Sequence, residues 1–157
     1  METVVVKGII AKRLKERAEK LDLTIEEYLL ELLTRDMDPK DRAREYAAAA
    51  SSLIEEAINE LKKENTRQAA EKVWGAAALT VKAYASWKDG KRLTSHGELW
   101  EYKRKLEAEL GDWAGDAWAR AVEMHVCFYE GWCNKNDIER AITKVKKLAE
   151  KVKQKIP

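Results

Sequence analysis

Apolar residues recur every three or four positions along most of this 157-residue chain, which is the spacing of amphipathic helices. The pattern predicts seven helices, at about residues 9–21, 25–33, 39–63, 67–87, 96–110, 112–131 and 137–155. Only residues 3–7, which read Thr-Val-Val-Val-Lys, have the β-branched character of a strand. We therefore predict an all-α fold, an up-and-down bundle of long helices with a short N-terminal strand-helix-helix arm.

Polar residues at the expected helix starts support these boundaries. A Ser, Thr or Asn followed three residues later by Glu indicates a capping box, which satisfies backbone N–H groups at a helix N-terminus. The predicted pairs are Thr24 with Glu27, Ser95 with Glu98, and Asn136 with Glu139. Asp38 and Pro39 have the residue types of an N-cap and a first helical position. The break at this point predicts two domains, an arm at 1–37 and a bundle at 38–157.

Composition agrees with long helices and short loops, because the chain contains only seven Gly and two Pro. Thirty basic and 28 acidic residues leave a net charge of +2, too small to indicate a nucleic-acid partner by itself. No apolar run approaches the roughly 20 residues of a membrane helix, and the charged start is unlike a signal peptide. We predict a cytoplasmic protein with no membrane contact. The excess of Lys and Glu over Asn and Gln is typical of thermophiles.

The two cysteines and the neighbouring histidine do not form a metal-binding motif. Cys127 and Cys133 are too few for a disulfide scaffold and indicate a reducing compartment, with buried thiols that pack as small apolar groups. His125 and Cys127 would lie about 200° apart around a helix, so they cannot clasp one ion. Glycine-rich phosphate-binding loops are missing as well. We expect neither a metal nor a cofactor.

Arg120 and His125 form an Arg-x4-His pair in the penultimate helix. Arginine can clamp a phosphate and histidine can move protons near neutral pH, so the pair suits metal-independent cleavage of RNA. Positions five apart on one helix point about 140° away from each other. A catalytic site would therefore be shared across a dimer interface. The alternative is that His125 is a core histidine, because it lies on an apolar stripe with Trp118 and Phe128.

This pattern, with the following aromatic residue, short polar loop and last basic helix, resembles the HEPN superfamily of helical-bundle proteins. Residues 37–140 are more closely similar to the archaeal PaREP family of HEPN-like proteins. The similarity lies in Met-Asp-Pro at 37–39, Ala-Glu-Lys-Val-Trp-Gly-Ala-Ala-Ala at 70–78, Ser-His-Gly-Glu-Leu-Trp at 95–100, and residues 125–132. The resemblance implies dimerisation near the motif and roles in RNA cleavage, nucleotide binding or toxin–antitoxin pairing. It assigns Arg120 and His125 as the ribonuclease pair, although Ala121 and Cys127 depart from the ribonuclease pattern.

Two basic clusters are further candidates for phosphate binding. Lys91 and Arg92 precede His96 at the start of a helix, where the N-terminus attracts anions. The last helix places a row of lysines beside its apolar stripe, and residues 136–157 carry a net charge of +4. The row includes Lys144, Lys147 and Lys151. Either cluster would otherwise be an ordinary solvated surface.

The six tryptophans divide into two groups by their place in the pattern. Trp74, Trp113 and Trp118 fall on apolar stripes and are expected in the core. The other three lie near helix ends or off the stripes, and they are candidates to line a pocket: Trp87, Trp100 and Trp132.

The N-terminal arm is similar to a ribbon-helix-helix module, which pairs strands from two chains and inserts them into the DNA major groove. Its first helix carries a net charge of +3, which suits DNA phosphates. The alternative is an arm that dimerises or packs on the bundle. Together these features predict a dimeric nucleic-acid- or nucleotide-binding protein. The alternatives are a metal-independent endoribonuclease and a non-catalytic, antitoxin-like protein partner.

Overall fold

A computed structural model describes residues 2–157, and the chain forms two compact units, Met1–Asp36 and Met37–Pro157. The described residues form seven helices and no strand. The all-α class is therefore confirmed. The predicted helix ranges agree with the observed ones to within about two residues at each end.

The first unit consists of α1 (Gly8–Lys20) and α2 (Ile25–Leu33). Thr24 caps α2, because its hydroxyl oxygen accepts a hydrogen bond of 3.0 Å from the Glu27 N–H. The predicted strand at 3–7 is wrong, since residues 2–7 form neither helix nor strand. A β-branched run becomes a strand only beside a second strand that completes its hydrogen bonds, and this chain supplies none among its described residues.

The second unit consists of five helices: α3 (Pro39–Lys62), α4 (Thr66–Asp89), α5 (His96–Leu110), α6 (Asp112–Glu130) and α7 (Lys135–Lys155). Helix α4 is the central one and packs against the other four. Its many alanines allow this close packing, because small side chains let several helices approach one axis. At Gly75 a Cβ atom would lie 3.0 Å from the Leu53 side chain, so α3 and α4 are in close contact there.

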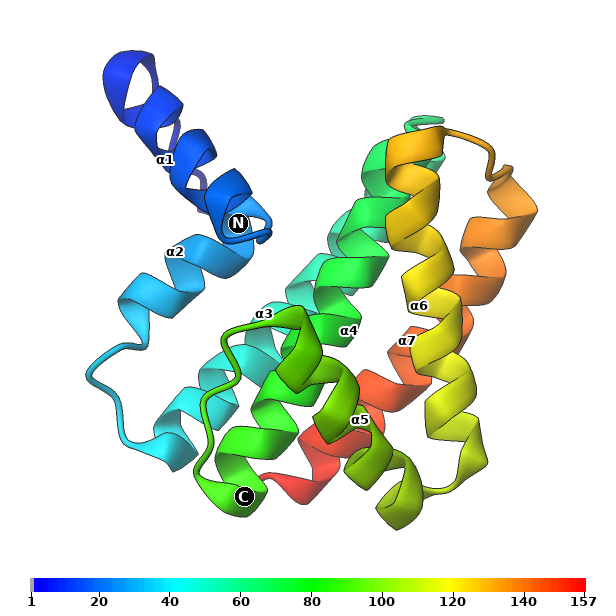
Figure 1. Ribbon diagram of the computed structural model, residues 1–157. Helices are drawn as coiled ribbons and strands as arrows, with labels where there is room; N and C mark the ends of the chain where they lie inside the picture. Colours follow the sequence, from blue (N-terminus) through cyan, green and yellow to red (C-terminus); the bar gives the residue numbers. More distant parts are fainter. Residues whose placement is uncertain (1) are drawn as a thin grey trace. The chain divides into compact units, whose positions relative to one another are not determined.

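The connection between α4 and α5 sets the position of the α5 N-terminus. Figure 1 shows this segment, residues 90–95, returning along α4, so that α5 then runs in the same direction as α4. The simple up-and-down order is interrupted at this point. As a consequence, His96 at the start of α5 lies beside the middle of α4, next to Trp74.

Helix α7 begins two residues earlier than predicted, with Asn134 as its N-cap instead of Asn136. Asn134 and Asp137 form a reciprocal capping box, with N–H to oxygen distances of 2.9 and 3.0 Å. No helix in the described residues is long and apolar enough to cross a membrane.

The cysteines are a second correction. Cys127 and Cys133 are buried, as predicted, but they form a disulfide and are not free thiols. The chain turns back after α6, and this turn brings the two Cα atoms to 5.7 Å. That separation lies within the range that a disulfide spans.

Candidate functional site

The only two histidines of the chain come together in the second unit. His96 is the first residue of α5, and His125 lies on α6 slightly more than one turn before its end. Their ring centres are 5.8 Å apart, and a ring nitrogen of one lies within 4.8 Å of a ring nitrogen of the other. Both side chains are half-buried. Two imidazoles at this distance can act on neighbouring atoms of one substrate, one as a base and the other as an acid.

Trp74 of α4 holds both histidines in place. The His125 ring stacks on the Trp74 indole at 4.8 Å between centres, and the His96 ring meets the indole edge-on at 5.6 Å. Trp74 is 3% exposed, so its prediction as a core residue is confirmed. Trp74 also forms the buried side of the histidine cluster.

Glu71 of α4 orients His125. Its carboxylate lies 3.2 Å from Nδ1 of His125, and both side chains keep less than a fifth of their surface exposed. A carboxylate at Nδ1 selects the tautomer with the proton on that nitrogen and leaves the lone pair on Nε2. In this tautomer the basic lone pair of the ring is on Nε2.

Tyr129 of α6 and Arg67 of α4 lie near the C-terminal end of α6. The Tyr129 ring lies 5.3 Å from the His125 ring and is 65% exposed. Arg67 lies on the same face of α4 as Glu71, one turn earlier, and its guanidinium packs against Gly131. Gly131 ends α6 in the left-handed conformation, with φ of 73°. A Cβ atom there would overlap the guanidinium, so a glycine at this position leaves room for the arginine.

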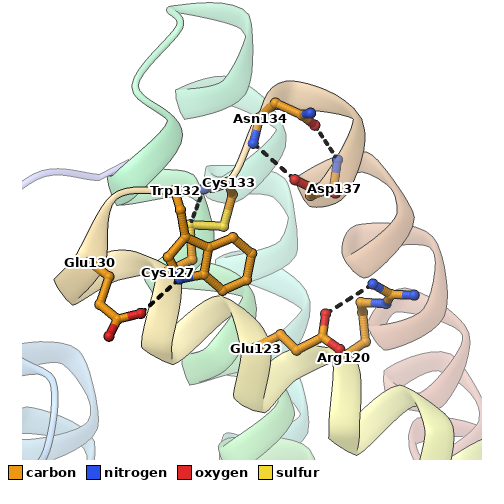
Figure 2. Close-up of a disulfide and its surroundings, with 8 residues drawn as sticks. All are labelled: Arg120, Glu123, Cys127, Glu130, Trp132, Cys133, Asn134 and Asp137. Atoms are coloured by element: carbon orange, nitrogen blue, oxygen red, sulfur yellow. Dashed lines mark hydrogen bonds and ion pairs between the residues drawn. A yellow bond between two sulfur atoms is a disulfide. The ribbon is translucent and has the colours of Figure 1, made fainter.

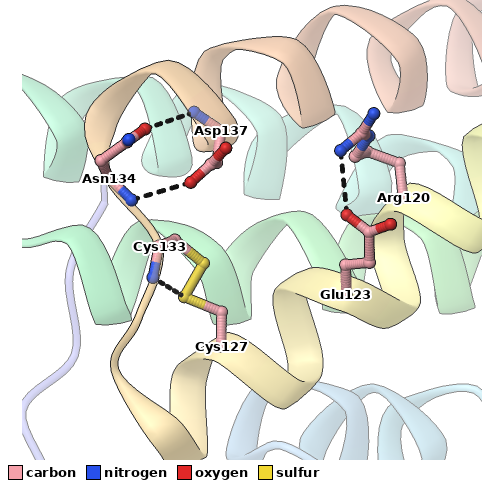
Figure 3. A network of polar contacts seen from close by, with 6 residues as sticks. All are labelled: Arg120, Glu123, Cys127, Cys133, Asn134 and Asp137. Carbon is pink, nitrogen blue, oxygen red and sulfur yellow. Dashed lines mark hydrogen bonds and ion pairs between the residues drawn. A yellow bond between two sulfur atoms is a disulfide. The ribbon is translucent and has the colours of Figure 1, made fainter.

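Arg120 does not join His125 within one chain. Its guanidinium pairs with Glu123 at 2.9 Å on the exposed side of α6, whereas His125 pairs with Glu71. Figure 3 shows the Arg120–Glu123 pair beyond the disulfide, toward the N-terminal half of α6. This separation agrees with the helical angle expected from the sequence. A site that combined both residues would need a second copy of the chain.

Lys91 and Arg92 line a pocket that does not include His96. The pocket has a volume of about 490 Å³ and lies between the end of α4 and the middle of α5, where Asp89, Tyr102 and Lys105 also line it. Asp89 accepts hydrogen bonds from Lys105 at 2.5 Å and Tyr102 at 2.8 Å, and these bonds lower its pKa. The hydrogen bond that Lys105 donates to Asp89 also raises the pKa of Lys105. The lining thus combines basic residues with three acidic ones, Asp89, Glu98 and Glu101.

The lysines of α7 are exposed, as an amphipathic helix requires. Lys144 and Lys151 extend from its polar face. The Lys147 ammonium lies 4.5 Å from the centre of the Trp113 ring, a cation–π contact. Trp118 is buried, as predicted. Trp100 is exposed and contacts Trp118, and Trp132 is exposed just after the end of α6.

The sequence indicates both histidines as candidates but at separate sites, and none of its motifs points to Glu71 or Arg67. One signal was available: Arg67, Glu71 and Trp74 follow the i, i+4, i+7 spacing of one helix face. Arg67 and Glu71 continue the face of Trp74 toward the N-terminus of α4. Charged residues in this position indicate that neighbouring helices cover that face only in part.

A known protein family matches the part of the chain that contains the two histidines. The model of the Archaeal PaREP1/PaREP8 family matches residues 45–149, two thirds of the chain. The chain belongs to the Archaeal PaREP1/PaREP8 family. The matched range contains Arg67, Glu71, Trp74, His96 and His125, so the histidine cluster lies within the part of this family member that the family model covers. No curated protein and no solved structure matches the chain.

Proposed function

We propose that this PaREP1/PaREP8 family member is a metal-independent endoribonuclease with His96 and His125 at its active site. The observation that carries the proposal is the meeting of the two histidines, one of them held by a carboxylate. A paired base and acid are what transesterification of RNA requires, because one proton leaves the 2′-hydroxyl and another reaches the departing 5′-oxygen.

In the proposed reaction, His125 Nε2 takes the proton of the 2′-hydroxyl, and the 2′-oxygen attacks the adjacent phosphorus. The bond from phosphorus to the 5′-oxygen breaks, and protonated His96 supplies a proton to that oxygen. The products are a 2′,3′-cyclic phosphate and a free 5′-hydroxyl. Glu71 stabilises the positive charge that forms on His125.

Two further groups fit an RNA strand at this site. Arg67 has no acidic partner among the described residues, so its guanidinium is available to a phosphate. The exposed rings of Tyr129 and Trp132 offer stacking surfaces for bases, as in proteins that bind single strands. The α7 lysines would contribute longer-range attraction, which makes binding sensitive to salt.

A cleavage assay with labelled single-stranded RNA tests the proposal. We expect His125→Ala and His96→Ala to reduce the rate by about 10²–10⁴, the usual contribution of a general acid or base. Glu71→Gln keeps the shape but removes the charge, and it should reduce the rate less than loss of His125. EDTA should have no effect. A substrate with 2′-deoxyribose at the cleaved position should stay intact.

Arg120→Ala is the matched control, because Arg120 lies on the same helix but pairs with Glu123. It should retain cleavage, and thermal melts should show every variant folded. An active His125→Ala variant, or wild-type protein that leaves RNA intact, contradicts the proposal. Equal loss in Arg120→Ala would instead support the Arg-x4-His pair, shared between two chains.

A second candidate is a dimeric protein that binds RNA or a nucleotide without cleaving it. The departure of Ala121 and Cys127 from the HEPN ribonuclease pattern favours it. In that case His125→Ala should weaken RNA binding, and affinity should fall steeply with salt. A HEPN-like bundle, a homodimer and a protein partner of the toxin–antitoxin type are compatible with both candidates.

A further inference from the structure

The turn after α6 is closed by a disulfide, whose first cysteine follows His125 by two residues. Cys127 lies on the last turn of α6, and Cys133 lies between Gly131 and the α7 N-cap Asn134. Figure 2 shows the cross-link next to Trp132, with the capping box of α7 directly beyond it. One covalent bond therefore joins the end of one helix to the start of the next.

We propose that Cys127–Cys133 is a reversible thiol–disulfide site that a small dithiol or a protein dithiol reduces. Three observations support it. The disulfide joins residues only six positions apart, so it closes a single turn between two helices. Cys133 is the more exposed partner, at 8% against 1% for Cys127. The Cys133 N–H also lies 2.9 Å from the Cys127 sulfur and donates to it.

These contacts determine the direction of the exchange. A reductant thiolate attacks Cys133 Sγ, the sulfur–sulfur bond breaks, and its electron pair goes to Cys127 Sγ. The Cys133 N–H stabilises the Cys127 thiolate that leaves. The second thiol of the reductant then displaces Cys133 from the mixed disulfide. Two protein thiols and one oxidised dithiol result, and the two electrons and two protons come from the reductant.

Reduction should also loosen the histidine cluster, and this part of the inference rests on the proposed function. In the sequence of α6, Cys127 is two residues after His125 and two residues before Tyr129. With the cross-link open, non-covalent contacts alone hold this end of the helix, among them the capping box of α7. Tyr129 would then be less firmly placed beside His125. The oxidised protein is expected to be the more active form.

Thiol counting and thermal melts test the redox site without reference to function. Protein purified without reductant should have no titratable thiol and gain two after treatment with dithiothreitol. Reduction should lower the melting temperature by about 4–10 °C, as expected for loss of a short cross-linked loop. The variant Cys127→Ala/Cys133→Ala is the control, because its melting temperature should not respond to dithiothreitol. Two free thiols in the untreated protein, or the same melting temperature in both states, would overturn the inference.

RNA cleavage by the oxidised and reduced wild type tests the coupling. We expect a several-fold lower rate after reduction, restored by reoxidation, with no change in the double variant. Equal rates in both states would overturn the coupling and leave the proposed function intact. Absence of cleavage in both states counts against the proposed function, while thiol counting still decides the redox site.

Discussion

Among single residues, Tyr84 and Tyr102 have pKa values raised above the ordinary phenol value. Burial raises the pKa of both phenols, and hydrogen bonds to carboxylates raise it further. The acceptor is Glu109 for Tyr84 and Asp89 for Tyr102. Each phenol thus joins α4 and α5 only while it keeps its proton, since the ionised oxygen would face a carboxylate.

The sign of this effect predicts how stability depends on pH. A pKa that folding raises favours the folded state below the ordinary phenol value of about 10, and this contribution is lost as pH rises above it. Wild-type protein should therefore exceed Tyr84→Phe/Tyr102→Phe in unfolding free energy at pH 8, by about 1 kcal/mol for each lost hydrogen bond. The difference should shrink at pH 11. Urea titrations at the two pH values measure it, and a constant difference would contradict the assignment.

Residues of the site show which parts of it the sequence can predict. Both histidines are visible as candidates, because imidazoles are rare here and lie near helix ends. The sequence does not predict that they lie close together, because this depends on the connection at 90–95, which places the α5 N-terminus beside Trp74. Glu71 is hidden in an alanine-rich segment where a charged residue is expected to face solvent. The Cys127–Cys133 bond depends on the turn at Gly131, which no spacing rule specifies.

Among elements, the helices are predictable because local signals define them. Thr24 and Ser95 cap α2 and α5 as predicted, each accepting a hydrogen bond from the N–H three residues on. The strand at 3–7 was wrong because a strand depends on a partner that the local sequence does not contain. At α7 two asparagines competed for the cap, and the capping box formed at Asn134.

That competition gives a paired test. Asn134→Ala should lower the unfolding free energy by about 1 kcal/mol, because it removes the acceptor for the Asp137 N–H. Asn136→Ala should be close to neutral, since Asn136 is an exposed residue inside the first turn. Denaturant titrations of the two variants compare these costs. A larger loss for Asn136→Ala would show that the helix begins later in solution.

At the scale of the whole molecule, the first unit has an unusually apolar surface. Ile9 and Ile10 on α1 are each about 60% exposed, and Val4 and Val5 are more exposed still. Exposed apolar groups that gather on one small unit indicate a protein interface. We expect this surface to pair two copies of the chain.

Light scattering at micromolar concentration measures the predicted dimer directly. The mass should be twice the 18.0 kDa of one chain. Ile9→Glu/Ile10→Glu should restore the single-chain mass, because charges oppose burial of that surface. Arg13→Glu, an equally exposed change on the same helix, should leave the dimer intact. Wild-type protein with the mass of one chain contradicts the prediction.

The Glu71–His125 contact couples two positions in the evolution of the family. Glu71 and His125 lie on different helices. Loss of His125 would leave the half-buried Glu71 carboxylate without its partner, which lowers the stability of the fold. A lineage that loses His125 is therefore expected to replace Glu71 soon afterwards with an uncharged residue. PaREP1/PaREP8 sequences should vary at these two positions together, and lineages that keep both should also keep a histidine at the start of α5.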